Sequence, residues 1–175
     1  MNSSDRFVPL DRRFRPFTGE GDIEEIATDS VFGSFLGRHT ESVRWEKILG
    51  SKGVRVILGE PGSGRTVEFK HQRQLLLDHG EASFYVPFHE LAYKEMDGIL
   101  LDRDLANYRS WKRGPDRCWI FLDAVDEAKL ESNRAWEAAL KNAYRSIGKE
   151  ALERTTILIS CRIHQWDPVL DPRRI

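Results

Sequence analysis

Residues 54–80 read VRVILGEPGSGRTVEFKHQRQLLLDHG. The first five are rich in β-branched side chains and stop at Gly59, which predicts a short buried strand. Residues 65–79 contain neither Gly nor Pro, and Gly80 follows them as a stop signal, so we expect a helix there. The stretch therefore predicts a strand and a helix that are joined by a glycine-rich loop.

Three later segments also predict strands, and helices alternate with them. The expected strands are residues 82–88 (ASFYVPF), 118–125 (CWIFLDAV) and 155–160 (TTILIS). Helices are expected over 133–147, where apolar residues recur at helical spacing, and over a short segment near 43–49. Residues 89–114 give no clear pattern. Apolar strands that alternate with helices indicate an α/β fold with a mostly parallel sheet covered on both faces.

The composition is that of a globular chain. Its 175 residues are 31% charged and 40% hydrophobic, and the net charge is −1. This balance supports neither bulk nucleic-acid binding nor binding to a membrane surface. The longest apolar run, residues 118–122, is too short to cross a membrane. No signal-peptide pattern is visible, and the two cysteines lie too far apart in the predicted sheet to pair, so the expected location is the cytoplasm.

The periodic pattern begins only after the first thirty residues. Residues 1–30 contain two prolines, two glycines and a basic cluster at Arg12, Arg13 and Arg15, which is typical of an irregular arm that is either solvated or bound to a partner. Residues 31–175 contain the predicted strands and helices, so we expect them to form a single domain.

The loop after the first strand fits the pattern G-x-x-x-x-G-[K/R]-[S/T]. Such a loop wraps phosphate oxygens with backbone N–H groups, and the following helix directs its positive N-terminus at the same anion. Arg65 would supply a cation to the outer phosphates, and the Thr66 hydroxyl would bind Mg²⁺. The alternative is an ordinary glycine-rich turn. The predicted nucleotide-binding residues are Gly59, Glu60, Pro61, Gly62, Ser63, Gly64, Arg65 and Thr66.

Acidic residues follow the third predicted strand. In a parallel sheet the carboxyl ends of the strands form the ligand crevice, so Asp123 would face the loop and could hold Mg²⁺. Asp126 or Glu127 could act as general base on the attacking water. After the fourth strand, Arg162 could sense the terminal phosphate. The alternatives are an acidic helix N-terminus and a surface arginine.

Together these motifs resemble the STAND class of P-loop NTPases, and within it the NACHT family. GEPGSGRT at 59–66 is similar to the Walker A motif, and FLDAVDE at 121–127 is similar to the NACHT form of Walker B, with a small residue after the metal-binding Asp. ILISCR at 157–162 resembles the strand that carries sensor 1. FLGRHTE at 35–41 resembles the segment that touches the base, which would add Gly37 and Arg38 to the nucleotide site.

The resemblance implies a P-loop NTPase fold, an ATP or GTP cofactor with Mg²⁺, and a switch role in signalling or antiphage defence. It predicts that the fourth strand lies between the first and the third, with the second at the edge. The first strand would be central in a complete core. Because a fifth strand and a helical lid do not follow, it is expected to be exposed on one side, and self-association or contact with other domains of a longer parent protein is expected.

Arg65 departs from the Walker A pattern, which has Lys at this position. Arg is a wide planar fork, so binding could survive while hydrolysis falls, and we expect low turnover from a chain derived from an ATP hydrolase. The alternative function is a catalytically inactive P-loop remnant that acts through protein–protein contacts. A nucleic-acid-stimulated ATPase is a third hypothesis, which the charge balance does not support.

Overall fold

The computed structural model describes Phe14 and residues 43–125 and 132–167. The chain divides into two compact units, Met1–Gly50 and Ser51–Ile175. In the first unit, the expected short helix is α2 (Trp45–Gly50). Phe14 forms an antiparallel bridge with Val43, and its ring meets the ring of Trp45 edge-on with the centroids 4.8 Å apart. The rest of the predicted arm 1–30 lies outside the described residues.

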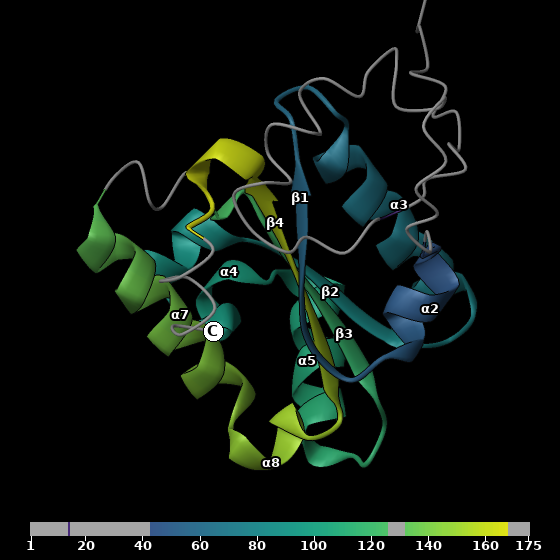
Figure 1. Ribbon diagram of the computed structural model, residues 1–175. Coiled ribbons are helices and arrows are strands. Elements are labelled where there is room, and N and C mark those ends of the chain that lie inside the picture. The colour runs from purple at the N-terminus through teal and green to yellow at the C-terminus, as the bar shows by residue number, and fades with distance from the viewer. Residues whose placement is uncertain (1–13, 15–42, 126–131, 168–175) are drawn as a thin grey trace, which may run out of the picture. The chain divides into compact units, whose positions relative to one another are not determined.

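In the second unit, strands and helices alternate along the chain (Figure 1). The strands are β1 (Gly53–Gly59), β2 (Ala82–Pro87), β3 (Cys118–Asp123) and β4 (Thr155–Arg162). The helical elements are α3 (Arg65–Asp78), η2 (Phe88–Ala92), α4 (Met96–Ile99), α5 (Asp102–Arg113), α7 (Asn133–Ile147), α8 (Lys149–Leu152) and η3 (Ile163–Gln165). None of the helices in the described ranges is long and apolar enough to cross a membrane.

The four strands form one parallel sheet in the order β1-β4-β3-β2. This order confirms the sequence prediction, and the fold is α/β as expected. Within the described part of the chain, β1 has one strand neighbour, which is β4. The sheet is parallel because each strand returns to the same edge after a helical segment, as α/β connections require.

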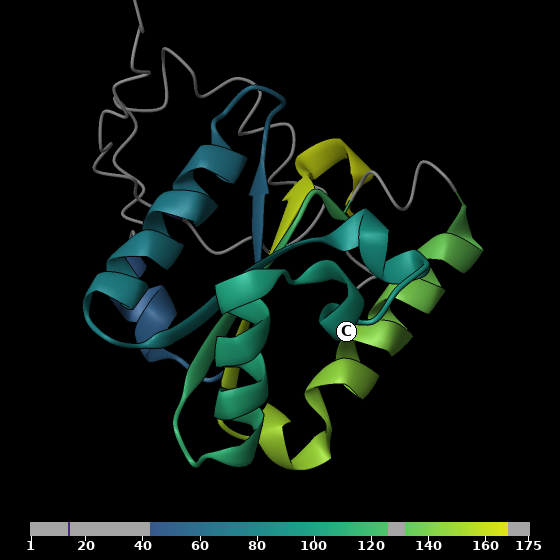
Figure 2. The same ribbon diagram turned by 180° about the vertical axis from the view of Figure 1, so that it is seen from behind.

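Helices cover both faces of the sheet, with α3 on one side and α5 and α7 on the other (Figures 1 and 2). On one face, Phe69 of α3 meets Phe121 of β3 edge-on at 5.2 Å. On the opposite face, Phe84 of β2 meets Tyr108 of α5 at 5.3 Å. All six residues of β3 are buried, because this strand lies between neighbours and under helices on both sides. Burial of each phenylalanine contributes about 1.5–3 kcal/mol to stability.

Arg73 of α3 reaches around the edge of the sheet at β2. Its Nε donates to the carbonyl oxygen of Ser83 at 3.4 Å. Its Nη2 donates to both carboxylate oxygens of Asp104 in α5, at 2.6 Å each. Since α3 and α5 lie on opposite faces, this ion pair joins the two helical layers across the β2 edge. It also covers an edge carbonyl that another strand could use for pairing.

The structure refines three of the sequence predictions. β3 ends at Asp123, two residues before the predicted end, because Ala124 takes a left-handed conformation with φ of 57°. β2 ends at Pro87, since Phe88 begins η2. Residues 89–114, which gave no clear pattern, contain α4 and α5. Both cysteines are free and buried, which agrees with the expectation that they do not pair.

Candidate functional site

The glycine-rich loop turns directly from β1 into α3. Gly62 and Gly64 have φ of 75° and 77°, a left-handed conformation that side chains with a Cβ rarely adopt. Gly64 is the N-cap of α3 and brings no side chain that could cap the first helical N–H groups. These N–H groups and the helix dipole therefore make the start of α3 a suitable place for an anion.

Arg65 does not extend into the loop but bends back to the strands. Its Nη1 donates to the carbonyl oxygen of Gly59 at 2.6 Å and to the carbonyl oxygen of Cys161. A Cβ on Gly59 would lie 3.3 Å from Cδ of Arg65 and 3.0 Å from Oγ of Ser63, so glycine makes room for this path. The guanidinium thus links the end of β1 to the end of β4 through their main chains.

Asp123 is buried, with 3% of its surface exposed, and both of its carboxylate oxygens accept hydrogen bonds. Oδ2 accepts from the Tyr85 hydroxyl at 2.7 Å, and Oδ1 accepts from the Ser160 hydroxyl. Ser160 in turn accepts from the backbone N–H of Ala124 at 2.9 Å. Donors on β2 and β4 therefore fix the plane of a carboxylate at the end of β3.

Strand pairing brings the loop and these side chains to the same edge of the sheet. Gly59 pairs with Arg162, and Pro87 pairs with Asp123. Arg162 is half-exposed and lies two residues after Ser160, so both side chains belong to the same face of β4. Asp123 lies on the α3 face of the sheet, because Phe121, two residues earlier in β3, packs against Phe69 of α3. The hydrogen bond between Ser160 and Asp123 places Ser160 and Arg162 on that face too.

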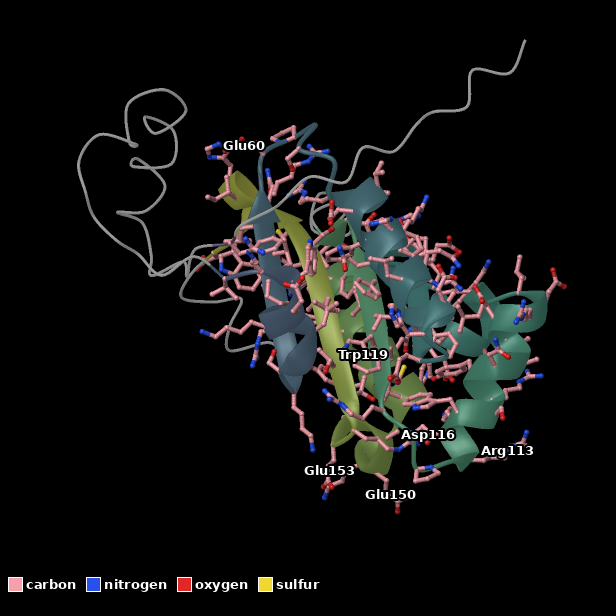
Figure 3. All side chains as sticks on the ribbon, turned by 90° about the vertical axis from the view of Figure 1, so that its right-hand side faces the viewer. Glu60, Arg113, Asp116, Trp119, Glu150 and Glu153 are labelled. Atoms are coloured by element: carbon pink, nitrogen blue, oxygen red, sulfur yellow. The ribbon has the colours of Figure 1, made fainter. Side chains whose placement is uncertain are left out.

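The outer part of the loop is also tied to the segment after β4. Oε1 of Glu60 lies 3.5 Å from Nε2 of His164 in η3, and both side chains are at least half exposed. Figure 3 shows Glu60 at the edge where β1 ends, far from Asp116 and Glu153 at the opposite edge. Solvent weakens an exposed pair of this kind, so we assign it little energy. Pro61 and Thr66 are exposed at the same edge, and Ser63 is half-buried.

Four predicted site residues cannot be placed. Gly37 and Arg38, predicted to touch the base, lie outside the described residues, and so do Asp126 and Glu127, the predicted general bases. Of the remaining predicted residues, the structure brings the loop 59–66, Asp123 and Arg162 to one edge. Their roles toward a nucleotide stay predictions.

The chemistry of the site fits Mg²⁺. Asp123 and Thr66 offer hard oxygen ligands, and each Asp123 oxygen that accepts one hydrogen bond keeps a second lone pair. Mg²⁺ is usually held by one or two protein oxygens, while it keeps several waters and binds substrate phosphates. Across residues 43–125 and 132–167, no three His, Cys, Asp or Glu side chains gather in a metal-binding cluster. A metal here would therefore depend on water and phosphate for most of its ligands.

Two residues of the Asp123 network were not among the predicted site residues. The sequence pattern places Tyr85 within an apolar strand and Ser160 at the end of another. The period-2 alternation of β2 contains the signal for Tyr85, because it places that residue on the same face as Pro87, which pairs with Asp123. The hydrogen bond also needs the pairing register of β2 with β3, which local sequence does not give.

Comparison of the chain with protein-family models, with curated proteins and with solved structures finds no match. The resemblance to the NACHT family therefore stays a prediction, carried by the motifs themselves.

Proposed function

We propose that this chain is a Mg²⁺-dependent nucleotide-binding module of the P-loop NTPase type. Its nucleotide would be ATP or GTP, and its role that of a cytoplasmic switch in a signalling or antiphage defence protein. The observation that carries the proposal is the pairing of two features at one edge of the sheet. One is a loop with two left-handed glycines before a helix, and the other is a buried carboxylate at the end of β3.

Each residue would make a distinct contribution to binding. Backbone N–H groups of the loop and the N-terminus of α3 would hold phosphate oxygens. The Thr66 hydroxyl and the Asp123 carboxylate would hold Mg²⁺. When bound, this cation would neutralise charge on the phosphates. Arg162, half-exposed at the end of β4, would neutralise charge on the terminal phosphate.

The contacts of Arg65 favour a second candidate, a catalytically inactive remnant that acts through protein contacts. A guanidinium that is held by two main-chain carbonyls is not directed at a phosphate. In a remnant, Arg65 would be a structural link and the loop a rigid turn. The two candidates differ in whether nucleotide binds at all, so binding is the property to measure.

Titration calorimetry of the whole chain with ATP and with GTP, with and without Mg²⁺, separates the candidates. A nucleotide-binding module should take up one of them with Mg²⁺. Asp123→Asn should remove most of the Mg²⁺ dependence, because the amide carries no charge for the metal. Asp97→Asn is a matched control, since Asp97 lies in α4 and pairs with Arg109 on the surface.

Absence of binding at millimolar nucleotide would refute the proposal and favour the remnant. Binding that Asp123→Asn and Asp97→Asn affect equally would refute the assignment of Asp123 to the metal.

A further inference from the structure

The cation at the start of α3 is engaged by the main chain. Nη1 of Arg65 donates to the carbonyl oxygens of Gly59 and Cys161, so the guanidinium is held at the strand ends. The loop itself offers backbone N–H groups, which carry only partial positive charges, whereas a nucleoside triphosphate carries several full negative charges. A site for this anion therefore needs a side-chain cation from another residue.

Lys70 is a cation that has no carboxylate partner in the described part of the chain. It is exposed and lies in α3 four residues after Thr66, so the two side chains are neighbours on the helix surface. Its Nζ is 5.1 Å from the centroid of the Tyr85 ring, within the range of a cation–π contact. By contrast, Arg73, further along the same helix, is bound to Asp104.

The Tyr85 ring holds this ammonium close to Asp123. The hydroxyl of that ring donates to Oδ2 of Asp123 at 2.7 Å, so one ring contacts both the ammonium and the carboxylate. Arg162 is at the end of β4, which neighbours β3 on the side away from β2. The end of β3 therefore lies between a cation that α3 places over β2 and a cation at the end of β4.

The contact with the ring can be exchanged for a phosphate. A cation–π contact at an exposed site contributes little, whereas a hydrogen bond between an ammonium and a phosphate is charge-assisted and stronger. One helical turn separates Lys70 from Thr66, about 6 Å along the axis, which is close to the reach of a flexible lysine side chain. The ammonium can therefore leave the ring and meet a phosphate at the start of α3.

We propose that Lys70 supplies the side-chain cation for the outermost phosphate of a nucleoside triphosphate, in place of Arg65. This inference rests on the proposed function, because it concerns the phosphates of the bound nucleotide. The loop glycines precede α3, whereas Lys70 is one turn into the helix and near Asp123. Its ammonium would thus serve the phosphate nearest the metal rather than those within the loop, and Lys70 would favour a triphosphate over a diphosphate.

Lys70→Met tests the inference, since it removes the ammonium and keeps a long unbranched side chain. Calorimetry of the whole chain should measure the affinities for ATP, ADP, GTP and GDP with Mg²⁺. We expect triphosphate affinity to fall about tenfold, the effect of one charge-assisted hydrogen bond, and diphosphate affinity to change less than about twofold. Lys70→Arg keeps the charge and should restore most of the triphosphate affinity. Lys52→Met is the matched control, because Lys52 is exposed and precedes β1 at the opposite edge of the sheet.

The outcomes separate this inference from the proposed function. If the wild-type chain binds neither ATP nor GTP, the proposed function fails and the inference fails with it. If the wild type binds a triphosphate and Lys70→Met loses no more affinity for it than Lys52→Met does, only the inference fails. An equal loss for triphosphate and diphosphate, or a loss that Lys70→Arg does not restore, would show that Lys70 acts on the fold rather than on a phosphate. Either result would overturn the inference.

Discussion

Arg65 and Cys161 lie 96 residues apart in the chain, and the guanidinium of Arg65 donates to the main-chain carbonyl oxygen of Cys161. The same nitrogen also donates to Gly59. One side chain at the start of α3 therefore joins the ends of the two neighbouring strands β1 and β4. In the Walker A pattern a cation at this position serves phosphate, so under the proposed function stability and nucleotide affinity would compete for this guanidinium.

Arg65→Lys should lower thermal stability and raise nucleotide affinity. Lys has a shorter reach and a compact head, so it loses contact with one or both carbonyl oxygens but can turn toward phosphate. We expect a loss of about 1–2 kcal/mol, or roughly 3–6 °C in Tm for a chain of this size. Calorimetry with Mg²⁺–ATP and thermal unfolding measure the two effects.

Arg65→Ala, which has no cation, should lose stability without a gain in affinity. A Lys variant that gains no affinity would contradict this view of the site.

The ion pair across the β2 edge should contribute more to stability than an exposed pair. Arg73 and Asp104 are 20% and 36% exposed, whereas Arg109 and Asp97 are 58% and 43% exposed. Asp104→Asn should cost about 1 kcal/mol and Asp97→Asn less than about 0.5 kcal/mol. Urea unfolding of both variants makes the comparison. Equal losses would show that the bridge between α3 and α5 has no special effect.

Stability should fall as the pH rises above about 8.5, where free thiols ionise. Burial raises the pKa values of Cys118 and Tyr108, and partial burial raises that of Tyr144. The unfolded chain therefore releases these protons at a lower pH than the folded chain does. The stability that the protonated groups contribute is complete below their pKa in the unfolded chain, and it is lost as the pH rises from there toward their pKa in the folded chain. Each group lowers the free energy of unfolding by up to about 1.4 kcal/mol per pH unit.

Urea unfolding between pH 7 and 10 measures this dependence. Cys118→Ser and Cys118→Ala remove the thiol, so both should make the slope above pH 8.5 shallower, although each variant is less stable at pH 7. Slopes equal to that of the wild type would rule out Cys118 as the source.

Self-association should occur through β1. This strand has one strand neighbour in the described part of the chain, and a free strand edge pairs readily with another chain. Nη1 of Arg55 donates a hydrogen bond to the carbonyl oxygen of Val54, so this side chain partly covers the strand. Arg55→Ala should strengthen association, and Val56→Lys should weaken it by adding a charge. Sedimentation velocity over a wide concentration range tests both, and a monomeric Arg55→Ala variant would argue against β1 as the interface.

The sequence was sufficient for the parts of the fold that local patterns encode. The four strands are mostly apolar runs that end in glycine, in proline or in a charged residue. The apolar stripe of α7 runs through most of its length. Residues 89–114 were harder because their signals conflict. Leu101, an apolar residue, is the N-cap of α5, and Asp102 has φ of 46°. Gly98 lies within the single turn of α4, where it weakens the helical pattern.

The site was predictable only where a motif is contiguous. The loop 59–66 and Asp123 can be read from the chain, since each belongs to one strand end. The conformation of Arg65 cannot be read in this way, because its partner is on a strand that is distant in sequence. The Tyr85 hydrogen bond required the strand order, which was predicted, and also the exact register of β2 against β3, which was not.

The position of β4 has a consequence for synthesis of the protein. β4 is the last of the four strands to leave the ribosome, yet it lies between β1 and β3. At 5–20 residues per second, the 96 residues between Arg65 and Cys161 take on the order of 10 s to translate. During that time β2 and β3 can pair, but β1 has no partner within the sheet. A nascent chain that is arrested before Thr155 should therefore leave β1 more open to protease than the complete chain does, because the strand that pairs with β1 has not yet been made.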